Sequence, residues 1–137
     1  MIPYQGKVKK LAGTSYKEVW KKAQLYYSRI KKRTKRKLYI RSAYFNKQKI
    51  FFSYFWIHLS QKGWKQKTDR LRYFPSALEL IRKSRNKSSI RVNPNNKNEL
   101  LYRFAGLTKN KELFFVQIKE NVRTDRKYFM SVFSTDV

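Results

Sequence analysis

Hydrophobic residues recur every three to four positions through most of the first two thirds of the chain, and every second position through the last third. The first helical stretch follows Ser15 and Glu18, which have the spacing of a capping box at a helix start. Apolar residues then repeat at helical intervals from Val19 to Ile30. The pattern predicts a helix over about residues 15–32.

The next two segments are short and rich in aromatic residues. Residues 38–45, LYIRSAYF, alternate as a short strand does. In residues 50–65, IFFSYFWIHLSQKGWK, the side chains of Phe51, Phe55 and His58 fall on one helical stripe. We expect a helix there, although aromatic runs are also common in strands.

Another helix is indicated between residues 68 and 86. Thr68 is a candidate N-cap, Pro75 suits a first helical turn, and residues 77–81 supply an apolar face. Basic residues follow this face, as they often do near a helix C-terminus. We expect the helix to end near Ser84.

The period of two in the last third predicts four strands, over residues 88–93, 99–107, 112–120 and 127–134. The polar segments between them have hairpin length, so the strands should form an antiparallel meander. The predicted fold class is α+β, with N-terminal helices packed on a C-terminal four-stranded antiparallel sheet. One face of the sheet should pack on the helices and leave Arg103, Gln117 or Lys119 on the other face available to a ligand.

Charge is the unusual feature of the composition. The chain has 34 Lys and Arg against 8 Asp and Glu, for a formal net charge of +26, and no acidic residue lies between Glu18 and Asp69. Such an excess attracts polyanions, of which nucleic acid is the commonest. We expect phosphate contacts from the run KKRTKRK and from one later arginine: Lys31, Lys32, Arg33, Lys35, Arg36, Lys37 and Arg126.

Metal and nucleotide chemistry are disfavoured. The chain has no cysteine and one histidine, so neither a thiolate zinc site nor an imidazole-rich site can form. The eight carboxylates are scattered, whereas Mg²⁺-dependent hydrolysis needs them clustered. Glu99 and Glu112 could meet across a hairpin, but salt bridges are the favoured interpretation. No phosphate-binding or hydrolase motif is present, and we expect no metal and no cofactor.

A membrane partner is not expected. The N-terminus lacks the apolar segment of a secretory signal, and the longest nearly apolar stretch, residues 50–59, is too short to cross a bilayer. The prediction is a cytoplasmic protein.

RNA can be cleaved without a metal, because its 2′-OH can attack the adjacent phosphate once a base removes the proton. His58 is a candidate for that base, and Lys62, one helical turn later, would lower its pKa and favour the neutral imidazole. A histidine among aromatic residues can equally be a packed core residue. The sequence leaves both roles open.

Three strand residues could complete such a site. Arg103 interrupts an apolar strand and could clamp the transition-state phosphate, or it could lie on a solvated sheet face. Ser131 could donate to a phosphate oxygen, and Tyr128 could stack on a base. Ordinary strand packing would explain both of them as well.

Three segments carry a resemblance to a known group of nucleases: HLSQKGWKQKTDRLRYFPSALELIRKS, LLYRFAGLTKNKELFFVQIKE and YFMSVFS. In this order they resemble the barnase, EndoU, colicin-tRNase and RelE-like nuclease superfamily, especially its phage-associated branches. The resemblance covers roughly residues 46–135. It implies a RelE/barnase-like core in residues 46–137, to which residues 1–45 add a basic N-terminal helical arm.

The resemblance also implies a function. Members act on RNA without a metal, and many are toxins that an acidic antitoxin or immunity protein holds in check. His58 would take the position of their helical histidine, with Arg103 and Ser131 on the strands that supply the other groups. The second histidine or glutamate of several members is missing here, so no general acid is assigned. RelE-like members use Lys, Arg and Tyr instead, which makes Lys62, Arg126 and Tyr128 candidates.

The hypothesis is therefore an RNA-binding, metal-independent endoribonuclease acting on tRNA, mRNA or rRNA, with a toxin role implied by the resemblance. A protein that binds RNA without cleaving it, for example on the ribosome, would explain the charge equally well.

Overall fold

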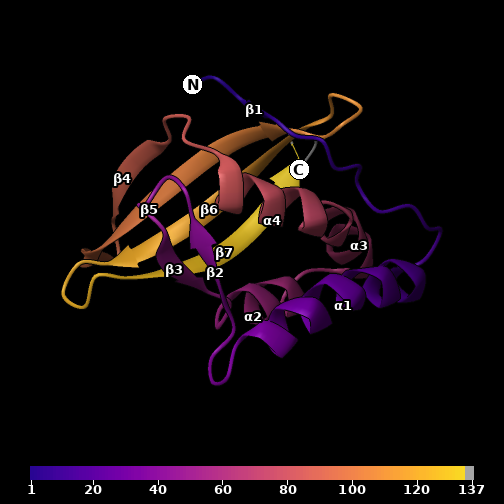
Figure 1. The fold of residues 1–137 in the computed structure, drawn as a ribbon, viewed down its shortest axis with the longest axis horizontal. Helices are drawn as coiled ribbons and strands as arrows, with labels where there is room; N and C mark the ends of the chain where they lie inside the picture. The colour runs from indigo at the N-terminus through magenta and orange to yellow at the C-terminus, as the bar shows by residue number, and fades with distance from the viewer. Residues whose placement is uncertain (135–137) are drawn as a thin grey trace.

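The structure is a computed structural model that describes residues 1–134 (Figure 1). The predicted core extends to residue 137, and its last three residues lie outside the described part. The helices are α1 (Tyr16–Arg33), α2 (Phe55–Ser60), α3 (Trp64–Arg72) and α4 (Phe74–Lys83). The strands are β1 (Tyr4–Gln5), β2 (Tyr39–Ser42), β3 (Gln48–Phe51), β4 (Ser89–Asn93), β5 (Asn96–Leu107), β6 (Leu113–Asn121) and β7 (Arg126–Ser134).

The strands form one curled, mixed sheet of seven strands in the order β1-β5-β6-β7-β3-β2, with β4 also paired to β5. The four predicted strands of the last third are present as the antiparallel series β4 to β7. Two parallel pairs extend it, β1 with β5 and β3 with β7. The prediction of N-terminal helices packed on a four-stranded antiparallel sheet, in the manner of RelE and barnase, is therefore wrong.

The strands that were not predicted come from segments in which the alternation of hydrophobic and polar residues is weak. β1 has two residues, too few to show any periodicity. The segment that we expected to be helical from residue 50 is a strand up to Phe51, and α2 begins at Phe55. Aromatic residues suit both states, and here the free edge of β7 gives Ile50 and Phe51 a partner strand. Thr68 is not a cap but lies inside α3, where its hydroxyl donates to the Trp64 carbonyl over 2.8 Å.

The concave side of the sheet holds the core, with α4 lying across it (Figure 1). Every residue of α4 from Phe74 to Ile81 is buried. The helix comes close to β5 at Gly106, where an added Cβ would lie 2.7 Å from the Leu80 Cδ1. The same Cβ would lie 2.5 Å from the Phe114 Cζ, so a side chain at this position would force Leu80 and Phe114 to move.

Glu79 ties the N-terminal segment to this layer. Its carboxylate is buried and accepts two hydrogen bonds of 3.0 Å from the backbone N–H of Lys7. Gly6, next to it, donates its N–H to the Leu107 carbonyl over 2.8 Å. A buried charge satisfied by backbone donors is stable, and it holds β1 against β5.

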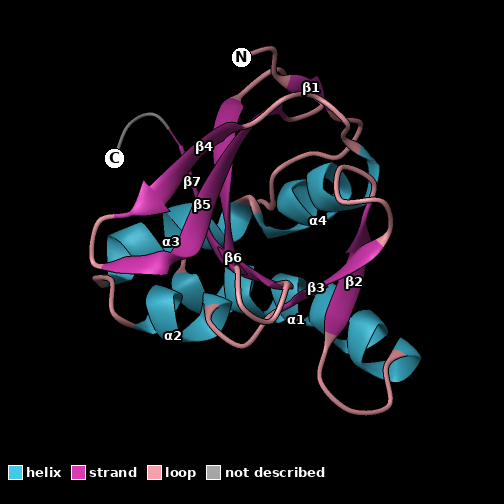
Figure 2. Cartoon of the chain, turned by 90° about the vertical axis from the view of Figure 1, so that its left-hand side faces the viewer, coloured by secondary structure: helices cyan, strands magenta, loops and turns pink. Residues whose placement is uncertain are grey.

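Helices α2 and α3 pack against β7. Strand β3 pairs with β7 only at Lys127 and Tyr128. Beyond that point Phe55 of α2 stacks on Phe129 with a ring-centroid distance of 4.5 Å. The two helices therefore lie beside β7, where Arg70 of α3 lines a hollow with Arg103, Gln117 and Ser131. Figure 2 shows α2 and α3 beside the long strands.

Within residues 1–134, no helix has both the length and the apolar character needed to cross a membrane.

Candidate functional site

The face of the sheet opposite α4 carries a row of polar residues. We call it the outer face. Strand pairing places Ser89 opposite Arg103, Arg103 opposite Gln117, and Gln117 opposite Ser131. Directly paired residues share a face, so the row crosses β4, β5, β6 and β7. Two of the predicted site residues, Arg103 and Ser131, thus lie on one face with Gln117 between them.

An irregularity in β7 shapes this row. On β6 the pairing advances by one residue, from Gln117 to Ile118, while on β7 it moves from Ser131 to Phe129. Met130 is therefore the extra residue of a β-bulge. Bulges re-aim side chains and are common beside functional sites.

His58 reaches this face from α2. With Phe55 and Leu59 of the same helix it lines a small cavity that Arg70 of α3 and residues 130–132 of β7 complete. Arg70 and Ser131 also line a larger neighbouring hollow of about 460 Å³. We call it the guanidinium hollow; it is formed by Arg70, Arg103, Phe115, Gln117, Ser131, Phe133 and Ser134. The structure thus places His58 beside Arg70 and Ser131, and Arg103 lies in the neighbouring hollow that Arg70 and Ser131 also line.

Arg70 is the functional candidate that the sequence did not reveal. Its guanidinium lies 5.6 Å from the centre of the Phe133 ring, and that of Arg103 lies 5.2 Å from the same centre. The buried Nε of Arg70 has no hydrogen-bond partner among residues 1–134. Burial also lowers the pKa of Arg70. An unpaired buried donor is costly, so the arginine carries an unfavourable contribution to stability at this position.

The electrostatic surroundings keep His58 neutral. Partial burial lowers the pKa of its imidazole most, and the charges of Lys62, Lys119 and Arg70 lower it further. A neutral imidazole can accept a proton at neutral pH. Lys62 is thus close enough to act on His58 through its charge.

Tyr128 lies farther along the outer face. It is paired with Lys119, and its ring meets that of Tyr54 at 4.9 Å. The Lys119 ammonium is 3.9 Å from the centre of the Tyr54 ring and 3.2 Å from the Glu99 carboxylate. Tyr128 is absent from the residues that line the two cavities around His58.

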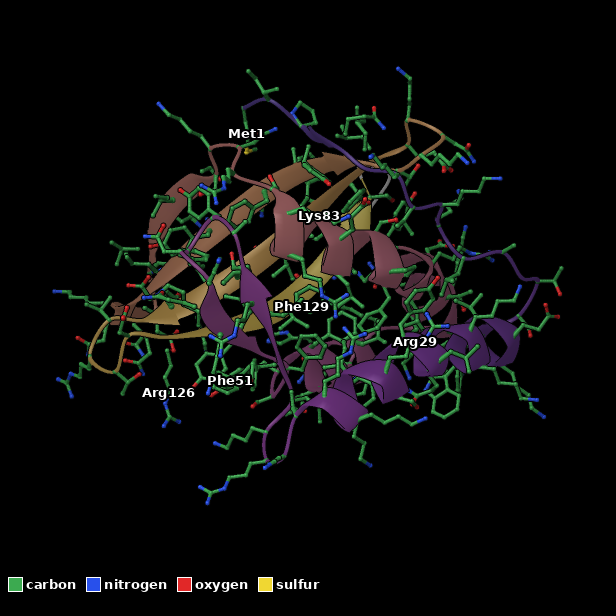
Figure 3. The ribbon with its side chains drawn as sticks, viewed as in Figure 1. Met1, Arg29, Phe51, Lys83, Arg126 and Phe129 are labelled. Carbon is green, nitrogen blue, oxygen red and sulfur yellow. The ribbon has the colours of Figure 1, made fainter. Side chains whose placement is uncertain are left out.

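Most of the predicted phosphate contacts gather in a second hollow of about 630 Å³. We call it the cationic hollow; its cations are Arg33, Lys35, Arg36, Lys37, Lys49 and Arg126. Tyr39 and Phe51 line it as well, and Figure 3 shows Phe51 and Arg126 close together at one end of the molecule. Lys31 and Lys32 are exposed in the last turn of α1 and are not among the lining residues. Lys49 was not predicted as a phosphate contact; it lies in β3, just before the segment that was expected to be helical.

The carboxylates of residues 1–134 hold the fold together. Glu99 pairs with Lys119 and Glu112 pairs with Lys10, so these two do not share a site. In the described part of the chain there is no group of three or more His, Cys, Asp or Glu residues placed to hold a metal ion. Asp136 lies outside the described residues.

Comparison of the chain with protein-family models, curated proteins and solved structures found no match. The interpretation of the site therefore rests on its geometry and charge.

Proposed function

We propose that the protein is an RNA-binding, metal-independent endoribonuclease whose reaction centre is formed by His58, Arg70, Arg103 and Ser131. One observation carries the proposal: the sole imidazole of the chain shares a small cavity with Arg70 and Ser131, Arg103 lines the adjoining hollow, and no carboxylate is among the described residues that line the two cavities. Such a cluster suits an anionic substrate and a reaction that needs a neutral base.

The chemistry follows from the state of His58. Its neutral imidazole removes the proton of a ribose 2′-OH, and the 2′-oxygen attacks the adjacent phosphorus. The bond from phosphorus to the 5′-oxygen breaks, leaving a 2′,3′-cyclic phosphate and a 5′-OH end. The leaving oxygen takes a proton from a second group, for which Lys62 and Tyr128 are the candidates on this face.

Arg70, Arg103 and Ser131 are assigned to the phosphate. In the transition state the non-bridging oxygens gain negative charge, which fixed donors stabilise more than they stabilise the substrate. Both guanidinium groups lie over Phe133, which restricts their motion. The Arg70 Nε is buried and has no hydrogen-bond partner among residues 1–134, so it is a donor that is still unused.

Cleavage in the presence of EDTA tests the proposal. The purified protein should cut single-stranded RNA with EDTA present, and His58→Ala should reduce the rate by about 10²- to 10⁴-fold. Ser60→Ala is the matched control, because Ser60 is exposed on the same short helix and should keep full activity. Uncut RNA, or equal cutting by His58→Ala, would refute the catalytic role.

A second candidate, RNA binding without cleavage, is favoured by one feature. The space beside His58 is only about 10 Å³, whereas the cationic hollow is far larger and His58 is not among its lining residues. A binder would show affinity that falls with salt but no turnover. Co-purification with ribosomal subunits would favour this function.

We also propose that an acidic protein can occupy the same surface, because the charge of +26 makes any acidic partner attractive. Growth arrest on expression, relieved by a co-expressed acidic partner, would support a toxin role. Unimpaired growth of cells that accumulate the folded, RNA-cleaving protein would argue against it.

A further inference from the structure

A row of aromatic residues crosses the outer face between the two hollows. Strand pairing places Tyr39 opposite Phe51, Phe51 opposite Tyr128, and Tyr128 opposite Lys119. Lys119 lies on β6 two residues after Gln117, and Gln117 belongs to the polar row that also contains Ser131. The aromatic row begins in the cationic hollow, where Tyr39 and Phe51 are lining residues, and ends beside the reaction centre.

The rings of this row are in contact from one end to the other. Ring centres are 6.1 Å apart between Tyr39 and Phe51 and 6.1 Å apart between Phe51 and Tyr128. Tyr54 continues the contact at 4.9 Å from Tyr128. We call Tyr39, Phe51, Tyr54 and Tyr128 the aromatic track.

Cations accompany the track along its length. At one end the Lys49 ammonium lies 4.7 Å from the centre of the Tyr39 ring. At the other, Lys119 lies 3.9 Å from the centre of Tyr54. Lys119 also lowers the pKa of His58, so its charge is felt at the reaction centre. Rings with a cation at each end suit a polymer that carries both flat bases and phosphates.

Packing alone does not account for the track. Core rings such as Phe55, Phe74 and Phe129 are 0–1% exposed, whereas all four track rings are only partly buried. Their contacts are largely edge-on or tilted, as at 67° between Tyr39 and Phe51 and 80° between Tyr54 and Tyr128. In an edge contact, the ring that points its edge at its neighbour keeps its own faces clear of that neighbour, so it can still stack on a base.

We infer that the substrate is a single-stranded RNA segment whose unpaired bases stack on the aromatic track while its phosphates run from the cationic hollow to the guanidinium hollow. The inference rests on the proposed function and adds the substrate class to it. In a duplex the base faces are already stacked on each other, so a helix could use the cations but not the rings.

The test measures binding with RNA that cannot be cut. A 12-nucleotide RNA with 2′-O-methyl groups, alone and as a duplex, is titrated against the protein by fluorescence anisotropy. The wild type should prefer the single strand. Tyr39→Leu and Phe51→Leu should each weaken single-strand binding by about tenfold and leave duplex binding unchanged.

Two further variants keep the test interpretable. Tyr39→Phe retains the ring and should bind as the wild type does, which separates stacking from folding. Tyr16→Leu is the control, because Tyr16 also lies near a lysine, with Lys67 5.9 Å from its ring centre, but packs on Trp64 outside the track. It should leave binding unchanged.

The outcomes separate the two proposals. Equal affinity for single strand and duplex would overturn the inference that bases stack on the aromatic track, even if the protein cleaves RNA. Unchanged single-strand affinity in Tyr39→Leu would overturn it as well. Loss of single-strand binding in Tyr39→Leu, with no cleavage of unmodified RNA, supports the track and refutes only the nuclease.

Discussion

Tyr128 and Ser131 lie on the same face of β7 although they are three positions apart in the chain. In a regular strand this spacing would place them on opposite faces. The bulge at Met130 restores them to one face, so that Tyr128 lies opposite Lys119 and Ser131 opposite Gln117. One extra residue thereby joins the aromatic track to the polar row at His58.

The neutral state of His58 predicts its titration. Burial and the charges of Lys62, Lys119 and Arg70 lower its pKa, so the free protein should show a value below about 6.5. With a single histidine in the chain, one imidazole resonance in proton NMR reports it directly. Lys62→Gln should raise this pKa, and the exposed Lys65→Gln should not. A wild-type value at or above 6.5 would contradict the described environment.

The lowered pKa of His58 also determines how the cleavage rate changes with pH. Since the base must be unprotonated, kcat/KM should fall as pH drops through the pKa of His58. Bound phosphates favour the imidazolium, so the acid limb of kcat should lie at higher pH than that of kcat/KM. Rates that rise toward acid would exclude His58 as the base.

Arg70 should lower the stability of the protein while it raises the cleavage rate. Arg70→Met removes a buried donor without a partner among residues 1–134, so the free energy of unfolding should rise by about 1 kcal/mol. The cleavage rate should fall by about 10²- to 10³-fold, because one transition-state donor is lost. Arg72→Met is the control on the same helix, since Arg72 faces Asp69 and the Leu11 carbonyl. Urea unfolding and cleavage assays measure the two effects, and an active Arg70→Met would remove Arg70 from the site.

The pattern along the chain was sufficient for α1 and for β4 to β7, because each has a long, regular period and polar turns. It was insufficient for β3, because the helical spacing of the aromatic residues after Ile50 concealed the strand that ends at Phe51, and for β1, which exists only because β5 offers it an edge. His58, Arg103 and Ser131 could be proposed from their residue types. Arg70 could not, since nothing local distinguishes it from Arg72, and the bulge at Met130 has no sequence signal.

Glu79 should contribute more to the free energy of unfolding than an exposed carboxylate does. Glu79→Ala leaves the Lys7 and Val8 N–H groups without their acceptor, so the free energy of unfolding should fall by about 1–3 kcal/mol. Asp69→Ala, which removes a half-exposed carboxylate 3.9 Å from Arg72, should cost less than about 1 kcal/mol. Urea denaturation compares them. Equal losses would show that the N-terminal segment is not held by Glu79.

The cationic hollow should dominate the salt dependence of binding. Replacing Lys35 and Lys37 with Gln removes two phosphate contacts, so the log–log slope of affinity against salt should decrease in magnitude by about 1.4 on single strands. Replacing the exposed Lys109 and Lys111 at the β5–β6 turn should leave the slope unchanged. Equal changes of slope in the two double variants would mean that RNA contacts the cations of the surface without preference for the cationic hollow.

Analysis of the cleaved ends tests the central claim most directly. An oligonucleotide with one ribose among deoxyriboses is incubated with the wild type and with His58→Ala in EDTA, and the products are weighed by mass spectrometry. We predict a 2′,3′-cyclic phosphate at the single ribose, formed by the wild type and not by His58→Ala. An intact oligonucleotide, or cuts at deoxyribose positions, would contradict a metal-independent ribonuclease that attacks through the 2′-oxygen.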